Sequence, residues 1–540
     1  MKRPAILKPL RLKSCVPFWL DIPHVDIGAS LTPDLLHQLY KGMFEHAKDW
    51  VENYIGTAEF DRRFKTMPQA QDLRHFKNGV MSVKNWAGRE SRDMMRQFLP
   101  VVLDAQAPIK LVQLIRALLD FSYLAHGEQL TEVELTEMDK ALASFHEAKY
   151  ILVRNELVVD NDAFDRIAKL HMLGHYTDSV RELGTPDGYS TELPEHLHII
   201  YVKIPWRMSN RRNPLPQMVS YVRRLEAIQI HRTLVDEYYG EREGADEEEI
   251  RTAKQFMEDE AAREANPPEF IDDEGGDEDV DGDKDDNENG DEDEGEVQGE
   301  SEEPSEITYY LRPAISVAKR PTVRRVSGQQ LISSYGASGL IRALHNFLSP
   351  KAKELGQNLL VLPSDHFDVW HKATLRHLPL SFAPARSSHR DVVRAHPLTR
   401  DSAGRVSNGA VFDAALFPAH RDCFGLQRYR AGRVHAIFAL PSHLERFYAG
   451  TGPLVYLDLF TPFEPDITKS HCLYSTTVAQ FDRHDVSMIV PLHCLAAACH
   501  IVPDFASPRL QPRFLFNGFY NYFTYLVMAN WRRRRLLQSG

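Results

Sequence analysis

One acidic block divides this chain of 540 residues and limits where a folded core can form. Residues 241–306 hold 31 of its 76 Asp and Glu residues but only 5 of its 64 Lys and Arg residues, a local net charge of -26. Charged and polar residues dominate this block, and its few apolar side chains cannot offset the loss of chain entropy on folding. This composition predicts a disordered linker, apart from a helix over residues 247–265. The remaining residues carry 59 basic against 45 acidic side chains, a net charge of +14, although the whole chain stands at -12.

This separation of charge indicates contact with nucleic acid by the basic, folded parts. A polyanionic segment in the same chain would then regulate or mimic that contact. A linker that only increases solubility is the alternative. Both interpretations place the chain's chemistry outside residues 241–306.

Cysteine usage and the termini bear on the compartment. Five cysteines, an odd number without a CxxC pair, argue against a disulfide framework and favour a reducing compartment. The basic N-terminus lacks the apolar core of a secretory signal. Residues 514–531 are apolar and aromatic, but Asn517, Asn521 and Asn530 interrupt them. We therefore expect a packed terminal element there and no membrane partner.

The distribution of apolar residues predicts an α+β fold in four segments. Residues 1–240 are expected to be mainly helical, because apolar positions recur at helical spacing over 109–125 and 131–157. The acidic linker, 241–306, is followed by a mixed connector, 307–403, with a helix and a basic cluster at 319–325 suited to nuclear import or phosphate contact. Residues 404–540 form a β-rich domain with a basic tail, expected to be a small barrel or sandwich. Its apolar runs are 410–416, 433–440, 454–460, 474–479 and 486–492.

Two short motifs have the spacing of metal ligands. His171 and His175 lie at i and i+4 in helix-favouring sequence, so both imidazoles project from the same side. Asp34 and His37 lie at i and i+3 on a helix for which we expect Thr32-Pro33 to be the N-cap and first turn. Together the four side chains would close a tetrahedral zinc site. The alternative is that they are ordinary polar residues, with Asp34 favoured in the first turn by the helix dipole.

A third motif places carboxylates before a run of arginines. Glu192 and Glu195 could bind a catalytic magnesium ion, while the arginines that follow hold a phosphate backbone. The arginines of this basic helical face are Arg207, Arg211, Arg212, Arg223 and Arg224. A solvated helix face is the alternative. For the C-terminal group His493, Cys494, Cys499 and His500, which lies in apolar sequence, we expect plain packing rather than metal binding.

These segments together resemble a known family. The chain is similar to the Plavaka transposases, fungal relatives of the CACTA group, over most of its length outside 241–306. The resemblance is carried by Pro17-Phe18-Trp19, residues 34–42, 73–79, 116–121, Lys169-Leu170-His171 and Pro194-Glu195, and in the C-terminal part by residues 432–434, 437–441, 456–463 and 499–503.

The resemblance implies a DDE cut-and-paste transposase with a ribonuclease-H-like core and a helical insertion before its last catalytic acid. In such enzymes two aspartates and one glutamate hold two Mg²⁺ ions for in-line attack on phosphate. By motif the glutamate is Glu195, with Glu192 as the runner-up. Asp34, His37, His171 and His175 match a structural zinc clamp of related recombinases. The implied location is the nucleus, and the implied partners are transposon-end DNA and a second transposase chain, identical or complementing.

The chain also departs from the family's pattern. Both catalytic aspartates are expected before Pro17-Phe18-Trp19, where this sequence has only 16 residues, and His196 stands where an arginine is usual. Asp21 and Asp26 lie in a loop-like stretch beside Pro23. We therefore expect an N-terminally truncated or degenerate transposase that is inactive alone. The alternative is a non-catalytic protein, derived from a transposon, that binds DNA or chromatin.

Overall fold

The computed structural model describes residues 16, 19–20, 22–23, 27, 31–84, 86–103, 107–240, 309–383, 388–400, 405–420, 422–465, 471, 473–482, 484–507 and 512–539. Contacts group the chain into two compact units. The first combines Met1–Ser190 with Tyr309–Gly540, and the second is Thr191–Thr308. The acidic linker with its predicted helix, together with Asp21, Asp26, Cys15 and Cys472, lies outside the described residues. The domain bounds predicted at residues 240, 306 and 403 therefore stay predictions.

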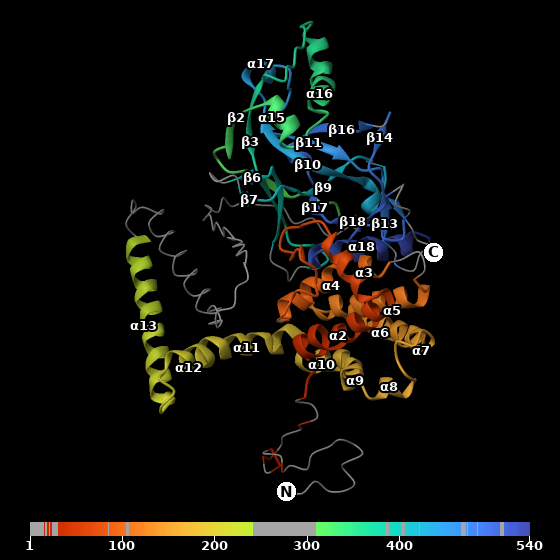
Figure 1. Ribbon diagram of the computed structural model, residues 1–540, viewed down its shortest axis with the longest axis vertical. Coiled ribbons are helices and arrows are strands. Elements are labelled where there is room, and N and C mark those ends of the chain that lie inside the picture. The colour runs from red at the N-terminus through yellow and green to blue at the C-terminus, as the bar shows by residue number, and fades with distance from the viewer. Residues whose placement is uncertain are drawn as a thin grey trace. The chain divides into compact units, whose positions relative to one another are not determined.

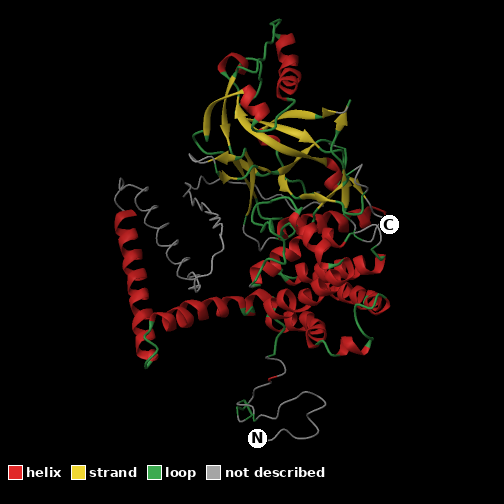
Figure 2. Ribbon diagram, in the orientation of Figure 1, coloured by secondary structure: helices red, strands yellow, loops and turns green. Residues whose placement is uncertain are grey.

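The N-terminal half of the first unit is helical, as predicted (Figure 2). Its central helix, α5, is buried along almost its whole length, and its bounds equal those of the predicted apolar stretch. Around α5 (Ile109–Ala125) lie η2 (Leu35–Met43), α2 (Phe44–Ile55), α3 (Thr57–Lys65), α4 (Gly88–Val102), α6 (Glu132–Ala148), α7 (Tyr150–Arg154), α8 (Asp162–Asp165), α9 (Ala168–Met172), η3 (Leu173–His175), α10 (Tyr176–Leu183) and η4 (Pro186–Tyr189).

The second predicted apolar stretch, 131–157, forms two helices rather than one. Helix α6 begins with a capping box, in which Thr131 Oγ1 accepts from the Glu134 amide at 3.3 Å and Glu134 Oε2 accepts from the Thr131 amide at 3.0 Å. It ends at Ala148, and the short helix α7 follows. Buried residues of both helices belong to the same apolar core as α5.

The C-terminal half of the first unit consists of antiparallel sheets. The largest has the order β16-β11-β10-β3-β2, with β9 pairing β10 and β17. Its central strand, β10 (Tyr429–Ala439), is flanked by β11 (Leu454–Leu459), β3 (His366–Trp370) and β9 (Ala414–Pro418). The other members are β2 (Val323–Ser327), β16 (Ser487–Pro491) and β17 (Ala497–Cys499). Four of the five predicted apolar runs contribute strands to this sheet: 410–416, 433–440, 454–460 and 486–492. Together with the helical half, the sheet confirms the α+β class.

Two smaller sheets complete this half. One has the order β1-β4-β5-β8 and the other β12-β13-β19-β18. Their strands are β1 (Ala314–Ser316), β4 (Lys372–His377), β5 (His389–His396), β8 (Val411–Phe412), β12 (Glu464–Pro465), β13 (Tyr474–Thr476), β19 (Phe514–Phe516) and β18 (Ile501–Pro503). Two hairpin pairs are β6 (Thr399–Arg400) with β7 (Val406–Asn408) and β14 (Gln480–Phe481) with β15 (His484–Asp485). Several strands therefore lie before residue 404, where the predicted β-rich segment begins.

Three helices are associated with the large sheet: α15 (Gly328–Ser333), α16 (Leu340–Glu354) and α17 (Ser442–Glu445) (Figure 1). Leu331 and Leu344 from α15 and α16 share a core with Phe367 and Phe438 of the sheet. The rings of Phe367 and Phe438 meet edge to face with centroids 5.4 Å apart. This core is distinct from the one around α5.

The last helix, α18 (Tyr522–Ser539), joins the two halves of the first unit. Tyr525 Oη donates to the Asp120 carbonyl of α5 at 3.3 Å, and Arg96 Nε of α4 donates to the Tyr520 carbonyl at 2.7 Å. Trp531 is only 4% exposed. These contacts confirm that residues 514–531 contribute a packed terminal element. No described helix is long and apolar enough to cross a membrane.

The second unit is a run of helices with little core of its own. It consists of α11 (Glu192–His198), η5 (Ile199–Lys203), α12 (Ile204–Met208) and α13 (Pro214–Gly240). Among its residues 191–235, whose side chains the structure describes, Pro205 alone is buried. The basic face predicted at residues 207–224 lies in this unit.

Candidate functional site

Asp34 is the N-cap of η2, which corrects the expectation that Thr32 caps this helix and Pro33 opens it. Asp34 has extended backbone angles, φ -107° and ψ 141°, and the helix begins at Leu35. Its Oδ2 accepts hydrogen bonds from the amide of His37 at 2.7 Å and from His37 Nδ1 at 2.6 Å. The carboxylate is mostly buried, whereas the His37 side chain is 49% exposed. The i, i+3 spacing thus produces a helix cap and a side-chain hydrogen bond at once.

His171 and His175 face one another, although the helix between them is not continuous. His171 lies on α9 and His175 ends the 3₁₀ turn η3, yet their Nε2 atoms are 3.2 Å apart. Both side chains are exposed. Two nitrogens bound to one tetrahedral zinc ion at its usual bond lengths lie about 3.3 Å apart. The pair therefore has a spacing compatible with a shared ion, and equally with one imidazole donating to the other.

The structure brings the segments that carry these two pairs together. Tyr176 Oη, one residue after His175, donates to the Asp34 carbonyl at 2.9 Å. Lys169 Nζ, two residues before His171, donates to the Lys41 carbonyl at 2.7 Å. Segments more than 120 positions apart are thus held side by side. No group of three or more His, Cys, Asp or Glu side chains placed to hold a metal ion occurs among the described residues.

The two candidate catalytic acids lie at the start of α11 in the second unit. Glu192 is the first residue of the helix and is half-buried, and Glu195 is exposed one turn later. Carboxylates in the first turn are favoured by the helix dipole whatever their chemical role. Their place in the first turn therefore gives both acids a structural reason to be there.

The basic helical face is built around an ordered turn between α12 and α13. Arg207 lies on α12, and Arg211 and Arg212 lie in the turn. Gln217 Nε2 donates to Asn210 Oδ1 and to the Arg212 carbonyl, both at 2.8 Å. Arg211 has a φ of 60°, in the left-handed region that non-glycine residues seldom adopt. The turn thus fixes the backbone from which two adjacent guanidinium groups project into solvent.

Arg223 and Arg224 lie farther along α13, at the edge of a shallow groove of about 580 Å³. Leu215, Val219 and Ala227 supply its apolar wall. All five arginines of the basic helical face are exposed. Guanidinium groups beside a shallow apolar surface suit a polyanionic partner, because they contact phosphates while their stems stay on protein.

The C-terminal group of His and Cys residues is partly buried. Cys499 and His500 are buried, whereas His493 is exposed. His500 Nε2 donates to the Pro68 carbonyl at 3.1 Å, and its Nδ1 accepts from Asn517 Nδ2 at 3.1 Å. Burial lowers the pKa of His500 to about 4. For this residue the expected plain packing is confirmed, with a neutral ring that joins the two halves of the unit.

A buried carboxylate with two histidine partners escaped the sequence analysis. His377 Nε2 and His389 Nε2 donate to Asp391 at 3.0 and 2.8 Å. Burial opposes ionisation, but the two hydrogen bonds outweigh it and lower the pKa of Asp391 to about 2. Phe523 of α18 stacks on His389. The signal was available, because Asp391 occupies an inward position of β5 together with Val393 and Ala395.

Comparison with known proteins gives one match. Residues 4–51 match the family model described as Plavaka transposase. This N-terminal segment is similar to the Plavaka transposases. No curated protein and no solved structure matches the chain.

The Plavaka match covers one of the candidate pairs of residues. The other candidate residues are supported by their position in the structure alone. Asp34 and His37 lie inside the matched residues. His171, His175, Glu195 and the basic helical face lie beyond them. The similarity that suggests a transposon-derived protein therefore lies in the N-terminal segment. The roles of the later residues are proposals.

Proposed function

We propose that this chain is a DNA-binding remnant of a DDE cut-and-paste transposase that acts in the nucleus. The observation that carries the proposal is the row of exposed arginines on α12, the following turn and α13. Arginines recognise phosphate through several donors and retain their charge at any physiological pH. Transposon-end DNA is the proposed partner, bound through its backbone by Arg207, Arg211, Arg212, Arg223 and Arg224.

A zinc ion fits part of the proposed clamp. The 3.2 Å between the Nε2 atoms of His171 and His175 agrees with two ligands of one ion, and imidazole is a preferred zinc ligand. Asp34 and His37 do not form a described group of three or more ligands with this pair, so they would have to move toward it to supply the other two ligands. Such an ion would serve structure: it would tie the segment around Asp34 to α9 and η3. The zinc ion is thus proposed to have a structural role alone.

A pair of magnesium ions does not fit the described residues around Glu195. Two-metal catalysis needs several carboxylates around both ions. No described group of three suitable side chains meets that need. We therefore derive no cleavage step and propose that Glu195, with Glu192 as the runner-up, acts in strand transfer only together with two aspartates that the described residues do not bring to it. A non-catalytic role in binding DNA or chromatin is the alternative, favoured by the exposed position of Glu195 on α11.

The DNA-binding proposal is tested by the salt dependence of affinity. The slope of log K against log salt is negative, and each lost phosphate contact reduces its magnitude by about 0.9. R211A with R212A should therefore reduce the magnitude of the slope by about 2. The matched control is R89A with R154A, which removes two exposed arginines from the other unit. We expect the control to keep the wild-type slope. Equal slopes for all three proteins, or no binding at 50 mM salt, would overturn the proposal.

The zinc proposal is tested by metal analysis of the purified chain. We expect close to one zinc per chain, lost in H171A and in H175A. The control is H345A, which removes an exposed helical histidine of α16. Folded wild-type protein without zinc would show that Asp34, His37, His171 and His175 are ordinary polar residues. Loss of DNA affinity in R211A with R212A would be unaffected by that result, so the two proposals fail separately.

A further inference from the structure

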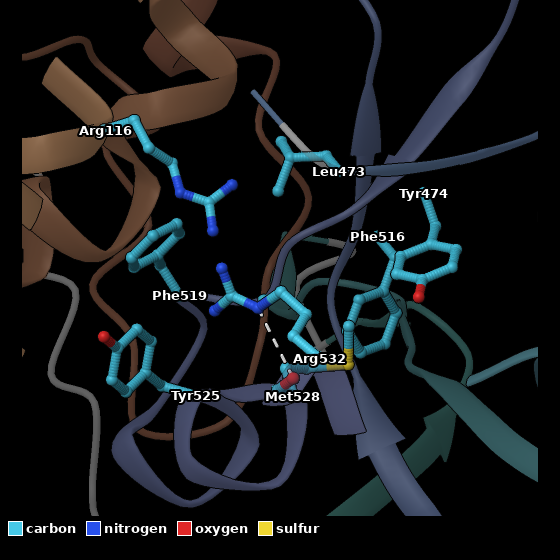
Figure 3. Close-up of a pocket in the computed structure, with 9 residues that line it drawn as sticks. Arg116, Leu473, Tyr474, Phe516, Phe519, Tyr525, Met528 and Arg532 are labelled. Carbon is cyan, nitrogen blue, oxygen red and sulfur yellow. Dashed lines mark hydrogen bonds between the residues drawn. The ribbon is translucent and has the colours of Figure 1, made fainter. Parts of the chain in front are cut away.

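The two compact units differ in how completely they bury their apolar side chains. In the first unit, Phe519, Tyr525 and Met528 line a cavity of only about 10 Å³ where α18 meets α5, which is roughly the space of one water molecule (Figure 3). In the second unit, large apolar side chains of α13 are between 42% and 67% exposed: Leu215, Val219, Ile228, Ile230 and Leu234. Contiguous apolar side chains in solvent mark a site for a partner.

Four of these side chains form one stripe along α13, with two opposite charges at its centre. Exposed Arg223 and Glu226 lie between the apolar positions. The spacing repeats after 11 residues, because positions 215, 219 and 223 are followed by 226, 230 and 234. An 11-residue repeat advances by about 3.7 residues per turn, close to the roughly 3.6 of the α-helix, so the six positions stay on one face. We call these six residues the α13 stripe.

The α13 stripe is complementary to itself when its direction is reversed. Residues at equal distances from its two ends match in character: Leu215 with Leu234, Val219 with Ile230, and Arg223 with Glu226. A two-fold axis across the helix, between residues 224 and 225, therefore places each side chain opposite its counterpart in a second copy. In a two-fold interface the same patch is used by both chains, and residue i contacts j while j contacts i. Apolar pairs would then flank two central ion pairs.

We propose that α13 associates with α13 of a second copy of this chain, antiparallel, through the α13 stripe. Val219 packs against the partner's Ile230, and Arg223 pairs with the partner's Glu226. Parallel helices would instead place Arg223 against the partner's Arg223 and Glu226 against the partner's Glu226. Charges that face one another between two helices set their orientation, and like charges oppose association. The central charges thus select the antiparallel arrangement.

The charge that follows α13 favours the same orientation. The acidic block, with its net charge of -26, begins directly after Gly240, the last residue of α13. Residue 241 lies about 17 residues from the two-fold axis, so antiparallel helices separate the starts of the two blocks by about 50 Å. This separation exceeds the Debye length of about 10 Å at 0.1 M salt, whereas parallel helices would bring the two starts side by side.

The inference goes beyond the DNA-binding proposal, because the association needs no DNA. Arg211 and Arg212, whose substitution tests DNA binding, lie outside the α13 stripe. Arg223 belongs to both surfaces, and the several N–H donors of its guanidinium group can serve a carboxylate and a phosphate together. Only six side chains from each chain meet, and small interfaces are weak. We therefore expect a dissociation constant on the order of 10 µM.

Sedimentation equilibrium of the full chain without DNA tests the association. We expect monomer at about 1 µM and mostly dimer at about 100 µM. I230D places a charge against the partner's Val219 and should raise the dissociation constant at least about 100-fold. The matched control is I228D, which changes an isoleucine of the same helix, 54% exposed, that lies outside the α13 stripe. A wild-type chain that stays monomeric at the higher concentration, or equal losses in I228D and I230D, would overturn the proposal.

A charge exchange tests the orientation of the two helices. E226R places like charges opposite one another in the antiparallel pair and should weaken association by about tenfold or more. R223E should do the same. The double variant, R223E with E226R, restores opposite charges and should return the dissociation constant close to the wild-type value. Parallel helices have like charges in all of these proteins, so an unchanged E226R would contradict the antiparallel pair. A double variant as weak as E226R would contradict the pairing of Arg223 with the partner's Glu226.

Discussion

At the residue scale, Asp34 combines a structural role with a proposed metal-binding one, and substitution separates the two. Its Oδ2 caps η2 through the His37 amide. Asparagine caps a helix as well as aspartate does, but alanine does not. We expect D34A to lower the free energy of unfolding by about 1 kcal/mol and D34N to leave it nearly unchanged. Urea unfolding measures both values.

Zinc content of the same variants then distinguishes the roles. If the carboxylate is a ligand, D34N folds normally but binds zinc weakly, because a neutral amide is a poor zinc ligand. D34N with the zinc content of the wild type would show that Asp34 is a cap alone. The expectation from sequence recognised the helix start but misplaced its cap by two residues, since Thr32, Pro33 and Asp34 all favour that position.

His500 gives the first unit a dependence on pH. Burial lowers its pKa in the folded chain to about 4, whereas histidine in an unfolded chain has a value near 6.5. Between these values the unfolded chain binds a proton that the folded chain does not. Stability therefore falls as the pH falls from about 6.5 to about 4, by about 2 kcal/mol at pH 5.

Replacement of His500 by glutamine tests this dependence. Glutamine keeps a donor for the Pro68 carbonyl but does not titrate, so H500Q should show a flatter stability profile between pH 6.5 and 5. The matched control is H493Q, which removes an exposed histidine of the same segment and should keep the wild-type profile. Chemical denaturation at several pH values provides the measurement. A wild-type profile in H500Q would refute the assignment.

At the element scale, α18 is the element on which the joint of the first unit depends. Trp531 is buried against Tyr429, whereas Trp206 on α12 is 43% exposed. We expect W531A to destabilise the first unit by about 3 kcal/mol or more, because truncating a buried aromatic residue leaves a cavity. W206A should change stability by less than about 0.5 kcal/mol. Calorimetry compares the two, and similar losses would contradict the packing described.

Local patterns predicted single elements better than their arrangement. Helix α5 was predicted to the residue because its apolar side chains recur at helical spacing behind Pro108. The turn η3 between His171 and His175 was missed, because the surrounding sequence favours a continuous helix. Strands β1 to β5 were absorbed into a connector, since runs such as Lys372–His377 alternate polar and apolar residues too briefly to stand out.

In the candidate site, too, local spacing could be predicted but the arrangement in space could not. The spacing of each ligand pair follows from helix geometry and could be predicted. The approach of the two pairs depends on Tyr176 reaching the Asp34 carbonyl across 142 positions. Likewise, the hydrogen bond from Tyr525 to the Asp120 carbonyl depends on the packing of α18 against α5. No local pattern encodes such contacts, because they form only when the whole unit folds.

At the scale of the whole molecule, we expect the acidic block to weaken the proposed binding of the chain to a polyanion. With residues 241–306 included the chain carries -12, and without their 31 acidic and 5 basic side chains it carries +14. Net charge of one sign repels DNA over roughly a Debye length, which is about 10 Å at 0.1 M salt. The block therefore opposes the binding proposed for the basic helical face, if it acts through its charge.

Neutralisation of the block tests this effect. A chain in which its Asp and Glu residues are replaced by Asn and Gln should bind DNA at least tenfold more tightly at 50 mM salt. The gain should shrink at 300 mM, because added salt screens the repulsion. A chain with the block's residues shuffled keeps its composition and charge, and should bind as the wild type does. If the neutralised chain binds no more tightly at low salt, the block serves as a solubilising linker, and the affinity for DNA is set within the basic helical face alone.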